Sequence, residues 1–417
     1  MHPKDACEKV SRWPIDHEFP LFFNILKRNF TLHLRAAVPP GAAGLLVAVA
    51  CLLAACGPGR APSPPAASEE LLGILEWPSP SADERYCAWY GSERDGVLYF
   101  GQAAFWSAMR DHDGDPRGDL KAPGPQHIGR VDLARRVVEA PLDVSEPGAR
   151  SGVWDVLAHD AGVFYTTFYE TAGRVNPATG EVIHFDGLGK GLNELAHGPD
   201  GAILVSRYGD ADGGDGSVLL LEPDGRIRSE HRLDPTPGHV VAPKSVAFDP
   251  VRREIWVNAD LLPQGDGQVR YDARILDLQG REQLRVETPE IQFVAFRPDG
   301  WGVTAEVDDR GLWLRILRPT DSDPMPERGQ RLLLDPHFDR GHDFAQDVQF
   351  ESGGERVIVM RWSGRYHLLD LARERGTSDV LPRADGGIFY TGAVHGDVLC
   401  ATLCGDVKVV CARPPPL

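Results

Sequence analysis

The sequence predicts an all-β protein that forms a single β-propeller. Five short stretches repeat one pattern: a polar residue, a variable one, an apolar one, usually a small one, and then an aromatic residue or His. They are residues 155–159, 193–197, 244–248, 292–296 and 346–350, and a sixth stretch, 85–89, fits the same columns. The apolar column recurs at a mean period of roughly 40 to 50 residues, which is typical of propeller blades.

The residues after each repeat predict a meander of short antiparallel strands. Residues 198–201 read Gly-Pro-Asp-Gly and precede the apolar run 202–206, and a second apolar run at 217–221 leads into another turn at 222–225. Strands rich in branched residues and bounded by Gly, Pro and Asp are expected to pair as hairpins. One such unit therefore predicts a blade of four strands.

The units follow one another along the chain and must close into a ring, because a blade needs neighbours on both apolar faces. We place them near 84–143, 152–187, 191–234, 243–288, 290–335, 343–381 and 385–411. The last unit has three good strands, and residues 71–77 are expected to supply the fourth. The prediction is seven four-stranded blades within one domain at 70–417, with six blades as the alternative.

Composition agrees with this fold and argues against some partners. The chain has 45 Gly and 34 Pro, as expected for a protein rich in turns. Its formal net charge is -17, which disfavours binding to nucleic acid or direct adsorption to an anionic membrane. We therefore expect no nucleic-acid partner and no membrane contact except through a lipid anchor.

The N-terminal region predicts export and lipidation. Basic residues precede an apolar segment at 41–55, and Leu-Ala-Ala-Cys at 53–56 resembles the lipobox of bacterial lipoproteins. Residues 1–55 are then the export signal, Cys56 carries the lipid, and 56–69 form a Pro/Ala/Ser-rich tether. An ordinary signal peptide or a membrane anchor is the alternative.

The predicted anchor also gives a location. Because Gly rather than Asp follows Cys56, the resemblance to Gram-negative lipoproteins implies retention at the outer membrane, on its periplasmic or outer surface. The apolar segment begins at Gly41, whereas signal peptides total roughly 15 to 30 residues, so we expect the true start codon to lie downstream of the assigned one.

The cysteines of the folded part fit an oxidising compartment. A hairpin near residues 405 and 406 would place Cys400 opposite Cys411, a spacing compatible with a cross-strand disulfide. The alternative is that both are small buried hydrophobic residues. Cys87 stands in an apolar column and is expected in the core.

The polar first column of the repeat is the predicted ligand site. In a propeller the innermost strands surround a central channel, so one polar residue from each of six blades should form a ring at its mouth. These residues are Arg85, Asp155, Asn193, Lys244, Gln292 and Gln346. The alternative is a channel that is merely filled with water.

Long insertions are expected on the same face. Residues 102–126, 208–216 and 258–268 interrupt the turn between second and third strands, and long loops in a compact domain are often functional. One loop contains Asp111, Asp113 and Asp115, whose alternating carboxylates suggest a calcium site. Pro116 and Ala122 stand where a full calcium loop has Gly and a bidentate Glu, so a solvated acidic loop is the default.

Residues 192–206 and 243–250 resemble the gluconolactonase and regucalcin-like propellers over about 150–310. The resemblance implies a divalent metal at the channel mouth that activates water for lactone or ester hydrolysis, and Asn193 matches a substrate-side Asn of that family. Lys244, however, replaces an Asn ligand, and Gln292 replaces the Asp that serves as ligand and base. These departures predict a non-catalytic relative, since a hard cation prefers several oxygen ligands that include carboxylates.

The sequence therefore predicts a lipid-anchored extracytoplasmic propeller that binds a small ligand or a protein partner at its channel mouth. The alternative function is a metal-dependent lactone or ester hydrolase with an altered site. A third hypothesis is a structural subunit of an envelope complex. No motif of the other common hydrolases is present in the sequence.

Overall fold

The structure is a computed structural model in which residues 65–417 form one compact unit. It describes residues 71–75, 86–104, 126–146, 152–167, 171–208, 216–264, 267–290, 292–322, 327–339, 343–381, 388–404 and 409–417. The regular secondary structure of the described residues consists of β-strands and one 3-10 turn, η2 (Pro199–Gly201). The prediction of an all-β propeller is confirmed.

Five separate sheets of four antiparallel strands follow one another along the described chain. The first two sheets are β6 (Asp155–His159), β7 (Gly162–Thr166), β8 (Ala172–Val175) and β9 (Val182–Phe185), then β10 (Leu192–His197), β11 (Ile203–Arg207), β12 (Ser217–Leu221) and β13 (Ile227–Arg232). The third and fourth are β14 (His239–Asp249), β15 (Glu254–Pro263), β16 (Arg270–Leu276) and β17 (Glu282–Thr288), then β18 (Phe293–Phe296), β19 (Gly302–Asp308), β20 (Gly311–Leu317) and β21 (Gln330–Asp335). The fifth is β22 (Ala345–Phe350), β23 (Arg356–Arg361), β24 (Arg365–Asp370) and β25 (Arg375–Val380).

The remaining strands form one eight-stranded sheet instead of two separate blades. Its strands are β1 (Leu71–Leu75), β2 (Tyr86–Arg94), β3 (Val97–Ala104), β4 (His127–Asp132), β5 (Val137–Asp143), β26 (Ile388–His395), β27 (Val398–Cys404) and β28 (Val409–Ala412). β1 pairs with β28, so the predicted N-terminal closing strand is confirmed. The prediction of seven separate four-stranded blades is not supported, because β2 and β27 pair at Cys87 and Cys404 and join the first unit to the last.

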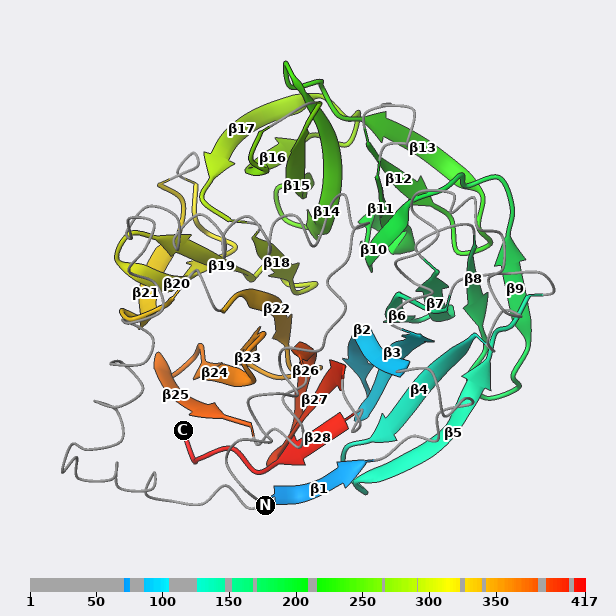
Figure 1. The fold of residues 1–417 in the computed structure, drawn as a ribbon, viewed down its shortest axis with the longest axis vertical. Helices are drawn as coiled ribbons and strands as arrows, with labels where there is room; N and C mark the ends of the chain where they lie inside the picture. Colours follow the sequence, from blue (N-terminus) through cyan, green and yellow to red (C-terminus); the bar gives the residue numbers. More distant parts are fainter. Residues whose placement is uncertain are drawn as a thin grey trace, which may run out of the picture. The chain divides into compact units, whose positions relative to one another are not determined.

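Neighbouring sheets meet through their first strands. β2 contacts β6, β6 contacts β10, and the series continues through β14, β18, β22 and β26 back to β2. Figure 1 shows these first strands nearest the centre of the described unit and the fourth strands, such as β5, β13 and β17, at its periphery. The contacts therefore form a closed cycle.

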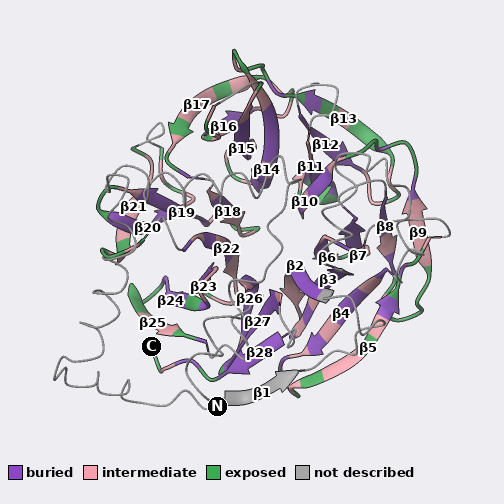
Figure 2. Cartoon of the chain, viewed as in Figure 1, coloured by how far each residue is buried: buried purple, intermediate pink, exposed green. Residues whose placement is uncertain are grey.

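Burial falls from the inner strands to the outer ones (Figure 2). The apolar clusters lie between neighbouring sheets: one contains Leu204 and Val218 of the sheet β10–β13 together with Val257 of the sheet β14–β17. Other clusters join β6–β9 to β10–β13 and β18–β21 to β22–β25. Packing between faces, rather than a single central core, thus holds the blades together.

Two disulfides lie in the eight-stranded sheet. Cys400 and Cys411 form the cross-strand disulfide that the sequence suggested, with Cα atoms 4.1 Å apart. Cys87 is buried as expected, but it also forms a disulfide with Cys404, at a sequence separation of 317 residues. The expectation that Cys87 lies in the core is confirmed, and its disulfide was not predicted because ring closure brings it opposite a cysteine far away in sequence.

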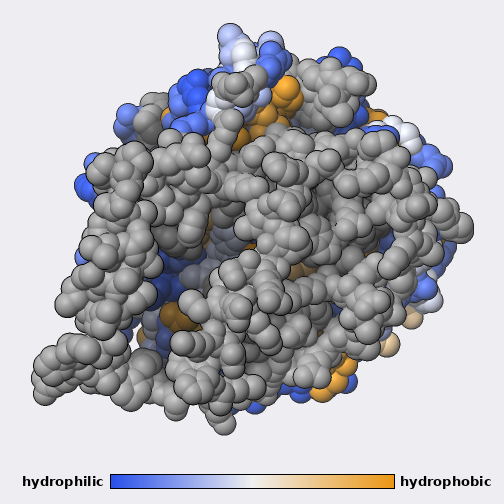
Figure 3. Space-filling view, in the orientation of Figure 1, coloured by the Kyte–Doolittle hydropathy of each residue, from blue (hydrophilic) through white to orange (hydrophobic). Residues whose placement is uncertain are grey.

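The described surface is mainly polar. Figure 3 shows hydrophilic residues along much of its outer edge and hydrophobic ones in small separate groups. Exposed large apolar side chains are scattered singly over outer strands and turns, at Val137, Ile227, Val251, Leu333 and Val380, and such single residues need no special explanation. Among the described residues, no helix is both long and apolar enough to cross a membrane.

Candidate functional site

The hairpins of the inner strands set which residues meet at the channel. β6 turns into β7 where His159 pairs with Gly162, and β2 turns into β3 where Arg94 pairs with Val97. Counting back four residues from each turn places Tyr90 in the column that Asp155 occupies. The sixth sequence repeat was therefore aligned five residues too early, and Arg85 itself lies outside the described residues.

The same count on β26, which turns where His395 pairs with Val398, places Thr391 in this column. The inner-strand column comprises Tyr90, Asp155, Asn193, Lys244, Gln292, Gln346 and Thr391. Five of the inner strands change register at or beside it, between Ala88 and Gly91, Leu192 and Leu195, Pro243 and Ser245, Ala345 and Asp347, and Phe389 and Gly392. Such bulges re-aim side chains and are frequent beside functional sites.

Several members of the column join neighbouring blades. Asp155 Oδ2 accepts a hydrogen bond of 2.7 Å from the Leu195 amide of the next sheet, and its Oδ1 accepts one from Val156 at 2.8 Å. Asn193 Nδ2 donates to the Lys244 carbonyl at 2.9 Å. The polar column therefore mainly links neighbouring inner strands through hydrogen bonds. Only some of its polar groups remain available for a ligand.

Tyr90, the tyrosine of the column, forms a hydrogen bond with a residue that is far away in sequence. The Tyr90 hydroxyl donates to Gln346 Oε1 at 3.2 Å. Tyr90 also lies in an aromatic cluster, with ring centroids 5.5 Å from Tyr390 and 5.8 Å from Trp154. Gln292, the remaining predicted ring residue, is half-buried, like Lys244 and Gln346. The channel end of the inner strands is thus partly exposed and lined by amide, ammonium and aromatic groups.

Three carboxylates gather at this end of the inner strands. Burial raises the pKa of Asp155 to about 6, against the two backbone hydrogen bonds that it accepts. Burial also raises the pKa of Asp347 to about 7, with the Asp155 charge adding to the effect and the Thr391 hydroxyl opposing it. Burial and then the charges of Asp155 and Asp347 raise the pKa of Glu194 well above its usual value. These shifts indicate that protons are retained in the cluster near neutral pH.

Glu194 was missed by the sequence reasoning because it stands one residue beyond the polar column. The Val246 amide favours its charged form, less strongly than burial disfavours it. Its Oε2 atom is buried and accepts no hydrogen bond from a described residue. The register change between Leu192 and Leu195 could not be read from the repeat, which assumes strict alternation of faces.

Further unsatisfied polar atoms lie on the neighbouring strand β15. Asp260 and Asn258 are two residues apart and therefore share one face of the strand, and Ser245 stands opposite Asn258 across the β14–β15 pair. These side chains are 5%, 2% and 0% exposed, yet Asp260 Oδ1, Asn258 Nδ2 and Ser245 Oγ have no hydrogen-bond partner among the described residues. Buried polar groups are ordinarily paired, so this group requires an explanation.

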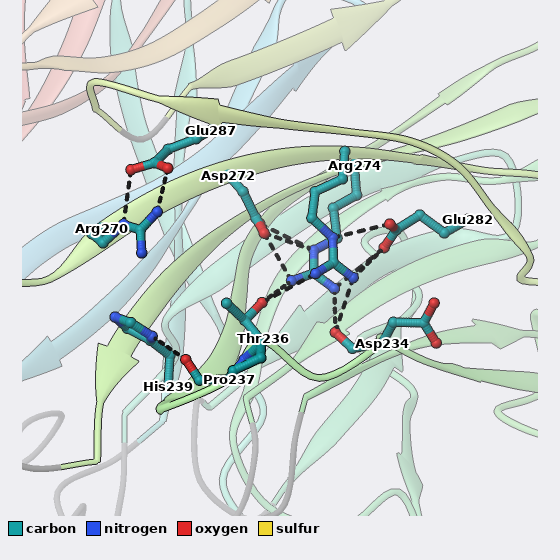
Figure 4. Close-up of polar contacts among 10 residues, drawn as sticks. Asp234, Thr236, Pro237, His239, Arg270, Asp272, Arg274, Glu282 and Glu287 are labelled. Carbon is teal, nitrogen blue, oxygen red and sulfur yellow. Dashed lines mark hydrogen bonds and ion pairs between the residues drawn. The ribbon is translucent and has the colours of Figure 1, made fainter.

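Arg274, a buried charged residue in the same sheet, has the hydrogen-bond partners that Asp260 Oδ1 lacks. The Arg274 guanidinium, which is 0% exposed, bonds to Asp272, to Thr236 Oγ1 at 3.0 Å and to the Asp234 carbonyl at 2.6 Å (Figure 4). Glu282 lies 3.4 Å from the same guanidinium. This charge is fully compensated within the protein and is structural, whereas Asp260 is not compensated by hydrogen bonds to both oxygens.

Tyr208 interacts with both unsatisfied carboxylates, and Lys244 interacts with Asp260. The charges of Asp260 and Glu194 both add to the effect of burial in raising the pKa of Tyr208. Burial raises the pKa of Asp260, and the nearby Lys244 ammonium opposes it. We call Glu194, Ser245, Asn258 and Asp260 the acceptor cluster, since three of its four unsatisfied atoms are oxygens. It is the part of the channel that the described residues leave chemically incomplete.

The predicted loops are only partly described. Residues 105–125, 168–170 and 209–215 lie outside the described residues, as do Cys56 and the suggested calcium residues Asp111, Asp113 and Asp115. The expectation that a loop begins at residue 258 is wrong: β15 continues to Pro263 and pairs with a long β14. In the part of the chain that the structure describes, no group of three or more His, Cys, Asp or Glu side chains is placed to hold a metal ion.

Comparison of the chain with models of known protein families and with curated protein sequences finds no match.

Proposed function

We propose that the protein is a lipid-anchored, extracytoplasmic propeller that binds a ligand at the channel end of its inner strands, in the acceptor cluster. The observation that carries the proposal is the set of buried, unsatisfied polar atoms on Glu194, Ser245, Asn258 and Asp260. Each such group costs about 1 to 3 kcal/mol when it has no partner. A ligand or bound water that supplies the missing partners accounts for their retention.

Some residues at and beside this cluster are not fully buried. Glu194, Tyr208, Lys244 and Gln292 are half-buried. Small-ligand sites usually combine aromatic and apolar side chains with a few placed polar groups, and Tyr90 brings an aromatic cluster beside Glu194. The protein partner that the sequence also suggested would contact the rim, whose loops are largely outside the described residues.

The anchor remains part of the proposal. We propose that Cys56 carries the lipid, that 56–69 are the tether, and that the protein is held at the outer membrane. The two disulfides are compatible with an oxidising compartment, where such bonds form and persist. Mass spectrometry of the membrane fraction should find a diacylated Cys56 at the mature N-terminus, and an unmodified Cys56 would contradict this part.

We also propose that the eight-stranded sheet acts as two blades, which restores a count of seven. Strands β2, β3, β4 and β5 form one meander, and β26, β27, β28 and β1 form the other. The two halves share one pairing, between Cys87 and Cys404, and the cycle of first-strand contacts passes through both β2 and β26.

A thermal-shift screen of the fragment from residue 69 tests the binding proposal. A library of sugars, amines, amino acids and organic acids should contain ligands that raise the unfolding midpoint, because a ligand bound only to the native state stabilises it. The shift should be lost in Glu194→Gln and kept in the matched control Glu355→Gln, whose side chain is exposed. If no compound shifts the midpoint, or every shift survives Glu194→Gln, the proposal fails.

A hydrolase related to the gluconolactonase-like propellers is the second candidate function. The observation that favours it is the pKa of Asp347, about 7, which suits a general acid or base near neutral pH. It would also need a divalent metal, for which the described residues provide no ligand group of three. Metal analysis of protein purified without chelator, together with a lactone and ester screen, tests it: a stoichiometric metal and turnover lost in Asp347→Asn would establish the hydrolase.

A further inference from the structure

We propose that the acceptor cluster binds a small hydroxylated primary amine, such as an amino sugar, with Glu194 and Asp260 holding the ammonium group and Asn258 and Ser245 bonding to a hydroxyl. This inference rests on the proposed function and specifies the chemistry of its ligand. It follows from which hydrogen-bonding groups the described residues leave without partners.

The missing partners define the donors that the ligand must supply. Glu194 Oε2 and Asp260 Oδ1 are carboxylate oxygens, which accept hydrogen bonds when ionised. A primary ammonium has three N–H donors and a positive charge, so it can satisfy both oxygens, whereas a quaternary ammonium has none to donate. Charge-assisted bonds of this kind are roughly twice as strong as neutral ones.

The other two unsatisfied atoms require a hydrogen-bond acceptor on the ligand. Asn258 Nδ2 is a donor, and the Ser245 hydroxyl can donate or accept. A ligand with only an ammonium group would leave Asn258 Nδ2 unsatisfied, while a hydroxyl near the ammonium would accept from it. Because Asn258 and Asp260 share a face of β15, both functions are required within one small molecule.

Charge at the site favours a cation. The ionisable groups coupled to Glu194 or to Asp260 lie on several elements: Asp155, Asp347, Tyr90, Tyr208, Lys244 and Tyr271. Lys244 is the one basic residue in this set. With the carboxylates ionised, the negative charges exceed the positive one, and a cationic ligand reduces the repulsion.

The aromatic residues add to the preference for a cation. Tyr90, whose pKa is raised by burial and further by Tyr390, Glu194 and Asp347, places an aromatic side chain beside the carboxylates. Trp89 and Trp154 extend this cluster, with ring centroids 4.4 Å apart. Aromatic faces beside carboxylates attract ammonium groups through the ring quadrupole.

Isothermal titration calorimetry of the fragment from residue 69 with glucosamine tests the inference. Binding should be measurable at pH 8, and N-acetylglucosamine, which keeps the hydroxyls but has no charge, should bind at least tenfold more weakly, about 1.4 kcal/mol. Choline, which has charge and a hydroxyl but no N–H on its ammonium, should also bind at least tenfold more weakly. Titration at pH 6.5 in buffers of different ionisation enthalpy should show proton release, because the bound cation favours ionised carboxylates.

Matched variants locate the site. Glu194→Gln and Asp260→Asn should each weaken glucosamine binding by at least tenfold, whereas Glu355→Gln and Asp309→Asn, which change exposed carboxylates, should not. Circular dichroism establishes that each variant is folded. If a variant is unfolded, the proton release of the unsubstituted protein decides the question.

The outcomes separate this inference from the function on which it rests. Equal binding of N-acetylglucosamine or choline, or absence of proton release, overturns the assignment of a primary amine. If no amine binds but the thermal-shift screen finds another ligand that depends on Glu194, only this inference fails. If that screen finds no ligand, the proposed function fails as well.

Discussion

Asp155 shows how a single carboxylate can hold two blades together. Its two oxygens accept from the Val156 and Leu195 amides, so it satisfies backbone groups of two different sheets. Asp155→Ala removes both acceptors and should lower the free energy of unfolding by about 2 to 6 kcal/mol at pH 5, since each buried amide left unpaired costs about 1 to 3 kcal/mol. Asp155→Asn keeps one acceptor and should lower it less.

Urea unfolding measures both values. Equal losses for Ala and Asn would show that the hydrogen bonds are not what Asp155 contributes. A loss below about 1 kcal/mol for Ala would show that water replaces the carboxylate at the joint.

Asp347 predicts how stability depends on pH. Its pKa is about 7 in the folded protein and the ordinary value is 3.8, so the native state binds a proton that the unfolded state has already released. The stability that this raised pKa contributes to the folded protein is therefore fully present below about pH 4 and is lost as pH rises to about 7. Buried His367, whose pKa is lowered to about 3, has the opposite effect below its ordinary pKa of 6.5.

Comparison with Asp347→Asn isolates the first effect, because His367 is present in both proteins. Relative to the variant, the unsubstituted protein should lose on the order of a few kcal/mol of stability between pH 4 and pH 8. Urea unfolding at several pH values measures the difference. Asp309→Asn, at an exposed position, should leave the profile unchanged, and a pH-independent difference for Asp347→Asn would contradict the prediction.

Among the elements, β1 joins the N-terminal part of the described chain to its last strand. It pairs with β28 from Leu71 to Leu75, far from β28 along the chain. A fragment that begins at residue 77 should unfold several degrees below one that begins at residue 69, because the last half-sheet then has three strands and an open edge. Differential scanning calorimetry measures both midpoints, and equal midpoints would show that the pairing is not stabilising.

The sequence predicted the blades well because turn residues and apolar columns are local signals. The predicted bounds of the five separate sheets agree with the strands within a few residues. It failed where geometry is not local: the bulge in β2 hid Tyr90, the register change in β10 hid Glu194, and the partner of Cys87 lies at the other end of the chain. The unsatisfied atoms of Asn258 and Asp260 carry no sequence signal, because only packing decides which polar groups lack partners.

At the scale of the whole molecule, the two disulfides should differ in strength. The chain-entropy relation gives about 6 kcal/mol for Cys87–Cys404 and about 3 kcal/mol for Cys400–Cys411, since their sequence separations are 317 and 11 residues. The double Ala variant of the first pair should therefore be about 3 kcal/mol less stable than that of the second. Guanidinium unfolding without reductant measures both, and a smaller loss for the first pair would show that other contacts already close the ring.

The pairing of β1 with β28 also determines how the protein would respond to mechanical load. A force on the proposed tether reaches β1 first and acts on its hydrogen bonds with β28 before it reaches any other sheet. Beyond β28 the sheet continues with β27 and then β2, which the Cys87–Cys404 disulfide joins covalently. Forces that separate β1 from β28 do not break this bond. Detachment of β1 would therefore lengthen the proposed tether while the remaining blades, and the proposed ligand site among them, stay closed.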